Sequence, residues 1–284
     1  MDVGVFTFAT DRDMGPAELA LEVEQRDFSS LMFTEHSHIP IAQDTPYPLA
    51  YGGGVMPDFY KRTYDPFVAC AFAASSTTRI RIGTAVCLLA LRDPVHTAKE
   101  VASVDRLSGG RFDFGVGFGW NVDEFASHGA DFSRRHAVVR ERVAMLRTLW
   151  TQDEASFDGD FHHLEPSWVY PKPLQPAGPP VLLGGNGPLS MKHAAKWADG
   201  WFPTGPLKDP TLKHTLPEFK RMVAEAGRDP STVSVGVAPG HVDRDTMAAY
   251  TDNGLDFVTV SVVAGSRDEM LRNLDTLAAI RDSV

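Results

Sequence analysis

The stretch GGRFDFGVGFGWNVDEF, residues 109–125, holds five glycines, and Gly115, Gly117 and Gly119 alternate along a run that otherwise has the composition of a β-strand. A Rossmann-type dinucleotide-binding turn needs the pattern G-x-G-x-x-G between the first strand and its helix. Here Trp120 stands three positions after Gly117, and three predicted strands precede the stretch. The fingerprint is therefore absent, and the fold has to be inferred from the whole chain.

Apolar, β-rich runs alternate with amphipathic runs along all 284 residues. The β-rich runs predict strands at residues 3–8, 30–36, 79–88, 111–117, 179–185, 200–204, 232–239 and 256–263. The amphipathic runs predict helices at residues 15–27, 65–76, 94–108, 134–150, 188–198, 216–227, 244–254 and 266–280. Eight strands alternating with eight helices predict a single TIM (β/α)8 barrel over residues 1–284.

Two long segments without a clear pattern interrupt this alternation. Residues 37–62 follow the second strand, and residues 151–179 precede the fifth strand. Both are too short to be domains, so we expect insertions that cover one end of the barrel. Inside a narrow barrel the alternating glycines relieve crowding, as expected for Gly115, whereas Gly119-Trp120-Asn121 at the barrel mouth is a candidate ligand contact.

Composition excludes several classes of function. The net charge is −10, so no basic patch for nucleic acid is expected. No apolar run reaches the roughly twenty residues that a membrane span needs. The two cysteines, Cys70 and Cys87, lie in separate apolar runs, which predicts neither a disulfide framework nor a cysteine-rich metal site. We therefore expect a cytoplasmic protein.

Catalytic residues of a TIM barrel lie at the carboxyl ends of its strands. His36-Ser37-His38 follows the second strand as a possible zinc-binding pair, but the fifth and sixth strands supply no further histidine, so no metal is expected. A glycosidase needs two facing carboxylates, and only Glu35 and Glu124 are candidates, with nothing that marks them as a pair. The nucleophile motif GxSxG is absent.

The barrel mouth is instead rich in glycine and aromatic residues, which favours a bound cofactor. Gly184-Gly185-Asn186-Gly187 directly precedes a predicted helix, and bare backbone N–H groups at a helix N-terminus bind phosphate. A glycine turn without function would have the same composition.

Three stretches carry a family resemblance: SLMFTEHSHIP (30–40), residues 77–125 and PPVLLGGNGPLSMKHAAKWADGWFP (179–203). They resemble the luciferase-like monooxygenase superfamily, and within it the coenzyme F420-dependent oxidoreductases of actinobacteria. The resemblance implies a TIM barrel with a deazaflavin or flavin ring in its mouth. It also implies a set of cofactor contacts: Glu35 and His36 beside the ring, a non-prolyl cis peptide at Ala85–Val86, a polar contact at Asn121, and the phosphate beside Gly184, Gly185, Asn186 and Gly187.

The resemblance further implies hydride transfer between F420 and a small organic substrate. His36 is then the proton donor or acceptor, or else a histidine that only hydrogen-bonds the cofactor or the backbone. Some sugar-phosphate dehydrogenases of this group carry a glutamate where Trp120 stands, so sugar-phosphate oxidation is not expected. The alternatives are an FMN-dependent monooxygenase that uses reduced FMN and O2, and a non-catalytic flavin or F420 carrier. A homodimer is also expected, since many relatives dimerise through barrel helices.

Overall fold

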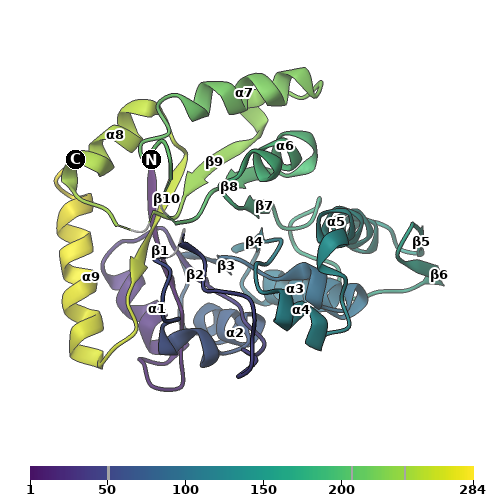
Figure 1. Ribbon diagram of the computed structural model, residues 1–284, viewed down its shortest axis with the longest axis horizontal. Coiled ribbons are helices and arrows are strands. Elements are labelled where there is room, and N and C mark those ends of the chain that lie inside the picture. Colours follow the sequence, from purple (N-terminus) through teal and green to yellow (C-terminus); the bar gives the residue numbers. More distant parts are fainter. Residues whose placement is uncertain (50–51, 206, 240) are drawn as a thin grey trace.

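The computed structural model describes residues 1–49, 52–205, 207–239 and 241–284. Its centre is a closed barrel of parallel strands in the order β1-β10-β9-β8-β7-β4-β3-β2 (Figure 1). In chain order these strands are β1 (Asp2–Thr7), β2 (Ser30–Phe33), β3 (Arg81–Thr84), β4 (Phe112–Val116), β7 (Val181–Gly184), β8 (Gly200–Phe202), β9 (Ser234–Val237) and β10 (Phe257–Val262). The TIM barrel predicted from the alternating pattern is confirmed.

Helices surround the barrel on its outside (Figure 1). They are α1 (Pro16–Gln25), α2 (Pro66–Ser76), α3 (Pro94–Leu107), α5 (Arg135–Thr151), α6 (Pro188–Trp197), α7 (Thr215–Glu225), α8 (Arg244–Asn253) and α9 (Arg267–Arg281). Several begin at a proline, which lacks the N–H that a first helical residue would leave unpaired. Asp65 and Asp93 cap α2 and α3 by accepting hydrogen bonds from backbone N–H groups of the first turn.

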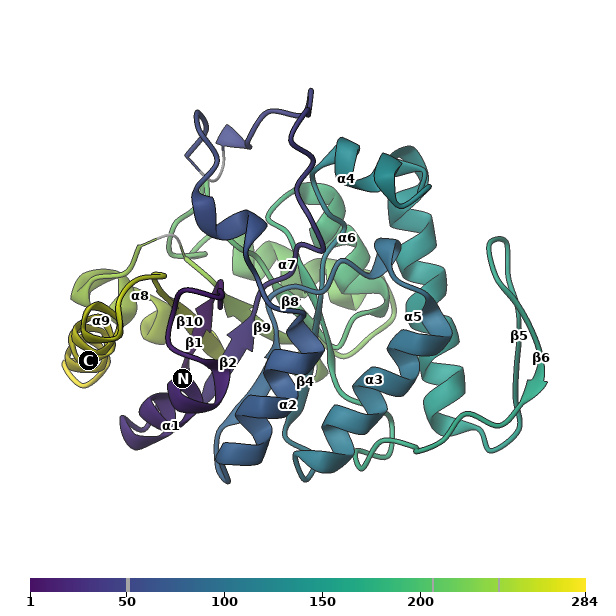
Figure 2. The same cartoon turned by 90° about the horizontal axis from the view of Figure 1, so that it is seen from below.

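The segment 151–179 differs from the prediction. It contains an antiparallel hairpin, β5 (Ala155–Asp158) and β6 (His163–Ser167), which stands outside α5 in Figure 2. Glu141 of α5 holds the hairpin turn, because its carboxylate accepts hydrogen bonds from the backbone N–H groups of residues 160–162. None of the residues of this segment lines the cavity described below, so the segment takes no part in forming the barrel mouth.

The glycines in and after β4 allow this strand to approach its neighbours closely. A Cβ added to Gly115 would lie 1.8 Å from the carbonyl oxygen of Thr84 in β3. A Cβ added to Gly117 would lie 2.3 Å from a methyl carbon of Val86. Gly115 thus has the packing role expected for it, and Gly117 makes room for a side chain at the barrel mouth.

We predict that Gly115→Ala lowers the free energy of unfolding by about 1–3 kcal/mol, because backbone on both strands would have to move. Urea denaturation measures the change. The control is Gly15→Ala, where an added Cβ contacts nothing within 4 Å; replacing this N-cap glycine should cost less than about 1 kcal/mol. Equal effects of the two substitutions would contradict the packing role.

Candidate functional site

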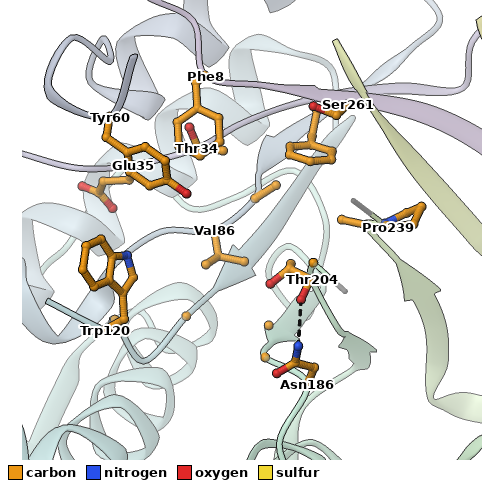
Figure 3. Close-up of a pocket in the computed structure, with 18 of the residues that line it drawn as sticks. Phe8, Thr34, Glu35, Tyr60, Val86, Trp120, Asn186, Thr204, Pro239 and Ser261 are labelled. Atoms are coloured by element: carbon orange, nitrogen blue, oxygen red, sulfur yellow. Dashed lines mark hydrogen bonds between the residues drawn. The ribbon is translucent and has the colours of Figure 1, made fainter. Parts of the chain in front are cut away.

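A cavity of about 870 Å³ opens at the carboxyl ends of the barrel strands. Its size lies in the range of cofactor and substrate sites. All but one of the predicted site residues line it: Glu35, His36, Ala85, Val86, Gly184, Gly185, Asn186 and Gly187. Figure 3 shows Val86 between an aromatic side, with Tyr60 and Trp120, and a polar side, with Asn186 and Thr204.

Val86 forms a ridge in this cavity. The peptide bond between Ala85 and Val86 is cis, as the family resemblance implied. Glycines flank the Val86 side chain, since a Cβ on Gly184 would lie 2.8 Å and a Cβ on Gly117 2.3 Å from its methyl carbons. Any larger residue at either glycine would displace the ridge, so the two glycines allow one branched apolar side chain to line the cavity.

His36 is fixed by a buried carboxylate. Its Nδ1 lies 2.9 Å from Oε2 of Glu124, whose side chain is 1% exposed. In the neutral tautomer whose Nδ1–H donates to this carboxylate, Nε2 is left as a proton acceptor. Within the described residues Nε2 makes no hydrogen bond. The rings of Tyr60 and Trp120 lie 5.3 and 5.7 Å from the imidazole, so an apolar wall borders the basic nitrogen.

From the sequence, Glu124 is a candidate only as a glycosidase carboxylate, and its contact with His36 was missed. Glu124 lies in the first turn of a short helix that was not predicted, α4 (Val122–Ser127), whose N-cap is Asn121. An asparagine cap followed by two acidic residues is a helix-start signal. That signal could have predicted α4 and placed Glu124 in its first turn.

Asn121 does not take the predicted place. It is fully buried, and it is not among the described residues that line the cavity. Its side-chain oxygen accepts from the backbone N–H groups of Asp123 and Glu124, and its nitrogen donates to Gln43. The amide is used in capping α4, so Asn121 orients Glu124, and the structure gives no support to a cofactor contact.

Glu35 lines the cavity, but protein groups occupy both of its oxygens. Oε2 accepts from the backbone N–H of Leu88 at 2.6 Å, and Oε1 accepts from Nε of Arg92 at 2.5 Å. Arg92 also pairs with Asp65 and Glu100. Burial alone would lower the pKa of Arg92, but the Glu35 and Asp65 carboxylates raise it above its ordinary value. The Glu35–Arg92 pair, which is the buried part of this cluster, holds the segment after β2 and with it His36.

The loop after β7 has the geometry of an anion site. Gly185 adopts a φ of +104°, and α6 begins at Pro188 without a side-chain cap. Uncapped N–H groups at a helix start favour an anion. Trp201 donates to the carbonyl of Gly185 at 3.0 Å, and Asn186 donates to that of Thr204 at 3.1 Å (Figure 3). Through these two bonds, β8 and the segment after it hold the loop that follows β7 in place.

Unpartnered polar atoms point to a missing ligand. In the described part of the chain, four buried side-chain N or O atoms lack a hydrogen-bond partner, and three belong to cavity-lining residues: Thr34, Arg135 and His136. The pKa of His136 is lowered to about 4, chiefly by burial and further by Arg135 and His193, so its ring is neutral near pH 7. Arg135 is the one arginine or lysine among the described lining residues. The residues present fit a cofactor that has a flat ring and an anionic tail.

The structure separates the two histidines of the H-x-H pair. His38 is exposed and bonds to Ser37, while His36 bonds to Glu124, so the H-x-H pair is divided between two environments. Over the described ranges, no cluster of three or more histidine, cysteine or acidic residues is arranged to hold a metal ion. Likewise, no helix in those ranges has the length and apolar character to span a membrane.

The family of the chain follows from comparison with known proteins. A family model described as luciferase-like monooxygenase matches residues 1–282. The chain belongs to the luciferase-like monooxygenase family. A member of this family from Mycobacterium tuberculosis, itself uncharacterised, is 38% identical over 282 residues and covers 98% of both chains.

Two further similarities concern proteins whose names state a cofactor. An F420-dependent glucose-6-phosphate dehydrogenase of Gordonia bronchialis is 30% identical over 220 residues, which is 75% of this chain and 59% of that relative. A solved structure of an F420-dependent secondary alcohol dehydrogenase, in complex with an F420-acetone adduct, superposes with a TM-score of 0.77 at 18% identity, covering 100% of this chain and 98% of that one. At that identity the likeness concerns the fold, and it agrees with the barrel of this luciferase-like protein.

Proposed function

We propose that the protein is an F420-dependent oxidoreductase that moves a hydride between the deazaflavin and a small, uncharged alcohol or carbonyl compound. The observation that carries the proposal is His36, whose Nδ1 is held by Glu124 and whose Nε2 makes no hydrogen bond within the described residues. The names of the F420-dependent relatives support the choice of cofactor.

The cavity offers a place for each part of F420. Its phosphate fits the uncapped start of α6 beside Gly185, Asn186 and Gly187. Arg135 suits the anionic tail, since its Nε lacks a partner in the described residues. The ring fits against the Val86 ridge. Once bound, F420 supplies the hydride chemistry at C5 of its deazaflavin.

His36 and Glu124 then bind and release the proton. Nε2 of His36 takes the hydroxyl proton when an alcohol is oxidised, and returns it to the oxygen when a carbonyl is reduced. Glu124 stabilises the resulting imidazolium, because its carboxylate is buried 2.9 Å from Nδ1.

The wall beside His36 defines the substrate class. Among the described residues, five aromatic side chains line that part of the cavity: Phe8, Tyr47, Phe59, Tyr60 and Trp120. Their rings pack on one another at centroid distances of 4.6 to 6.3 Å. No lysine or arginine stands among them, so the wall favours an uncharged, largely apolar substrate over a sugar phosphate.

Turnover with a panel of alcohols tests this proposal. The protein is mixed with oxidised F420 and either apolar secondary alcohols or glucose 6-phosphate, and the deazaflavin absorbance is followed. We expect reduction of F420 with an apolar alcohol and none with the sugar phosphate. Oxygen consumption with reduced FMN, and no F420 reduction, would contradict the proposal in favour of the monooxygenase. Binding of F420 without turnover of any substrate would favour the carrier.

Arg135→Ala is predicted to weaken F420 binding by about tenfold to a hundredfold, since a hydrogen-bonded charged contact contributes about 1.5–3 kcal/mol. A fluorescence titration measures the affinity. The neighbouring Arg134, which is exposed and stacks over the ring of Phe161, provides the control Arg134→Ala with unchanged affinity. Equal affinities of the two variants would remove Arg135 from the site.

The cytoplasmic location and the homodimer stay predictions from the sequence.

A further inference from the structure

A chain of polar contacts of 2.7 to 3.5 Å leads from the cavity to the protein surface. Nδ1 of His36 lies 2.9 Å from Oε2 of Glu124. The other carboxylate oxygen, Oε1, accepts from the backbone N–H of Ser37 at 3.2 Å and from its hydroxyl at 3.5 Å. That hydroxyl lies 2.7 Å from Nε2 of His128. His36 and Glu124 are buried, whereas Ser37 and His128 are exposed, so the contacts join the cavity to solvent.

We propose that Glu124, Ser37 and His128 form a proton relay between His36 and solvent. The relay deepens the function proposed above and rests on it for its role in turnover. It assigns Ser37 and His128 as positioning residues that act through His36, without touching the substrate themselves.

The need for such a route follows from the cavity. The aromatic wall borders His36, and a bound substrate would cover its Nε2, so while the substrate is bound a proton taken from it has no direct way back to water through the cavity. Each alcohol oxidised releases one hydride and one proton. The side of the imidazole opposite the cavity, at Nδ1, is the side that Glu124 contacts.

The steps balance one proton per turnover. The alcohol O–H bond breaks and its proton binds Nε2 of His36, while the C–H bond of the carbon that bears the hydroxyl breaks and would give its hydride to the bound cofactor. The proton on Nδ1 passes to Oε2 of Glu124, and a half-turn of the carboxyl group presents it to Ser37. The hydroxyl oxygen of Ser37 accepts it and gives its own hydrogen to Nε2 of His128, which releases a proton to water from Nδ1. Both imidazoles then carry their hydrogen on Nε2, and a flip of each ring restores the starting form before the next turnover. Carbonyl reduction runs the same steps backwards.

The other ionisable groups around the relay are few. Nδ1 of His38 lies 3.0 Å from the Ser37 hydroxyl, and the His38 and His128 rings are 5.4 Å apart, which gives a second exposed imidazole at the outer end. Asp123 precedes Glu124 in α4, but its carboxylate accepts from the N–H and hydroxyl of Thr45, and these bonds hold its pKa below the ordinary value.

The first test uses the protein alone and needs no turnover. NMR measures the exchange of the His36 Nδ1 proton with water in the wild type, Ser37→Ala and His128→Gln. The relay predicts exchange slowed several-fold in both variants, which are exposed changes that leave the fold intact. The control is His163→Gln, an exposed imidazole on the outer hairpin beside Asp158 and Glu165, with unchanged exchange. Unchanged exchange in all three variants would overturn the relay.

The second test measures turnover with F420 in dilute and in imidazole-rich buffer. For Ser37→Ala and His128→Gln, the relay predicts a lower kcat in dilute buffer and an unchanged KM. Imidazole in the buffer should restore kcat. The solvent deuterium isotope effect on kcat should rise in both variants. If each variant had the same kcat in dilute and in imidazole-rich buffer, the result would contradict the relay. Slowed exchange without turnover of any substrate would instead contradict the proposed function and leave the relay standing.

Discussion

Replacing His36 by alanine should lower kcat by about 10²- to 10⁴-fold, the usual contribution of a positioned acid or base. The reason is geometric: within the described residues His36 is the cavity-lining imidazole that a buried carboxylate orients, and its Nε2 is without a hydrogen bond. Steady-state turnover of an apolar alcohol with F420 provides the measurement. The affinity for F420, from a fluorescence titration, should change little.

The companion variant for this prediction is His96→Ala. His96 is an exposed histidine in the first turn of α3, where it contacts Asp93, and its loss should leave kcat unchanged. If His36→Ala kept more than a third of wild-type turnover, His36 would be a histidine that only hydrogen-bonds its surroundings, which is the alternative that the sequence left open.

Glu35→Ala should lower the free energy of unfolding by about 1–3 kcal/mol, because Arg92 would lose its buried carboxylate partner and keep Asp65 and Glu100, whose side chains are 42% and 40% exposed. The Glu35 side chain is 5% exposed and that of Arg92 is 17% exposed, so water cannot replace the lost carboxylate fully. The backbone N–H of Leu88 would lose its acceptor as well. Urea denaturation at neutral pH, followed by circular dichroism, provides the measurement.

Arg92 has another acidic partner that serves as the control. Glu100 lies 3.2 Å from Arg92 but is 40% exposed, so Glu100→Gln should cost less than about 1 kcal/mol. Similar losses for Glu35→Ala and Glu100→Gln would show that the Glu35 pair is no more than a surface contact, and that the end of β2 is held by other interactions.

The fold could be predicted from the sequence because each barrel element carries its own local pattern. The strands are short apolar runs, and helices such as α2 and α3 have a proline at their start and an aspartate cap before it. The loop at Gly184-Gly185-Asn186-Gly187 and the cis peptide at Ala85–Val86 could be placed as well. Here the residue types themselves, glycines before a helix and a family motif, carry the information.

The His36–Glu124 pair could not be predicted in the same way. The two residues are 88 positions apart, and only barrel closure together with the short helix α4 brings them to 2.9 Å. Asn121 shows the converse: an amide at the barrel mouth has the composition of a ligand contact, but it is used as a helix cap. The hairpin in residues 151–179 was missed because its strands, at Ala155–Asp158 and His163–Ser167, are largely exposed and lack an apolar run.

The most direct test of the account is a titration of the protein with F420 and, separately, with FMN, followed by cofactor fluorescence. The account predicts tight binding of F420 and weak binding of FMN, because the loop before α6 and Arg135 together suit a cofactor with a phosphate and a further anionic tail. Tight binding of FMN with weak binding of F420 would contradict the hydride-transfer proposal and assign the protein to the oxygen-activating members of its family.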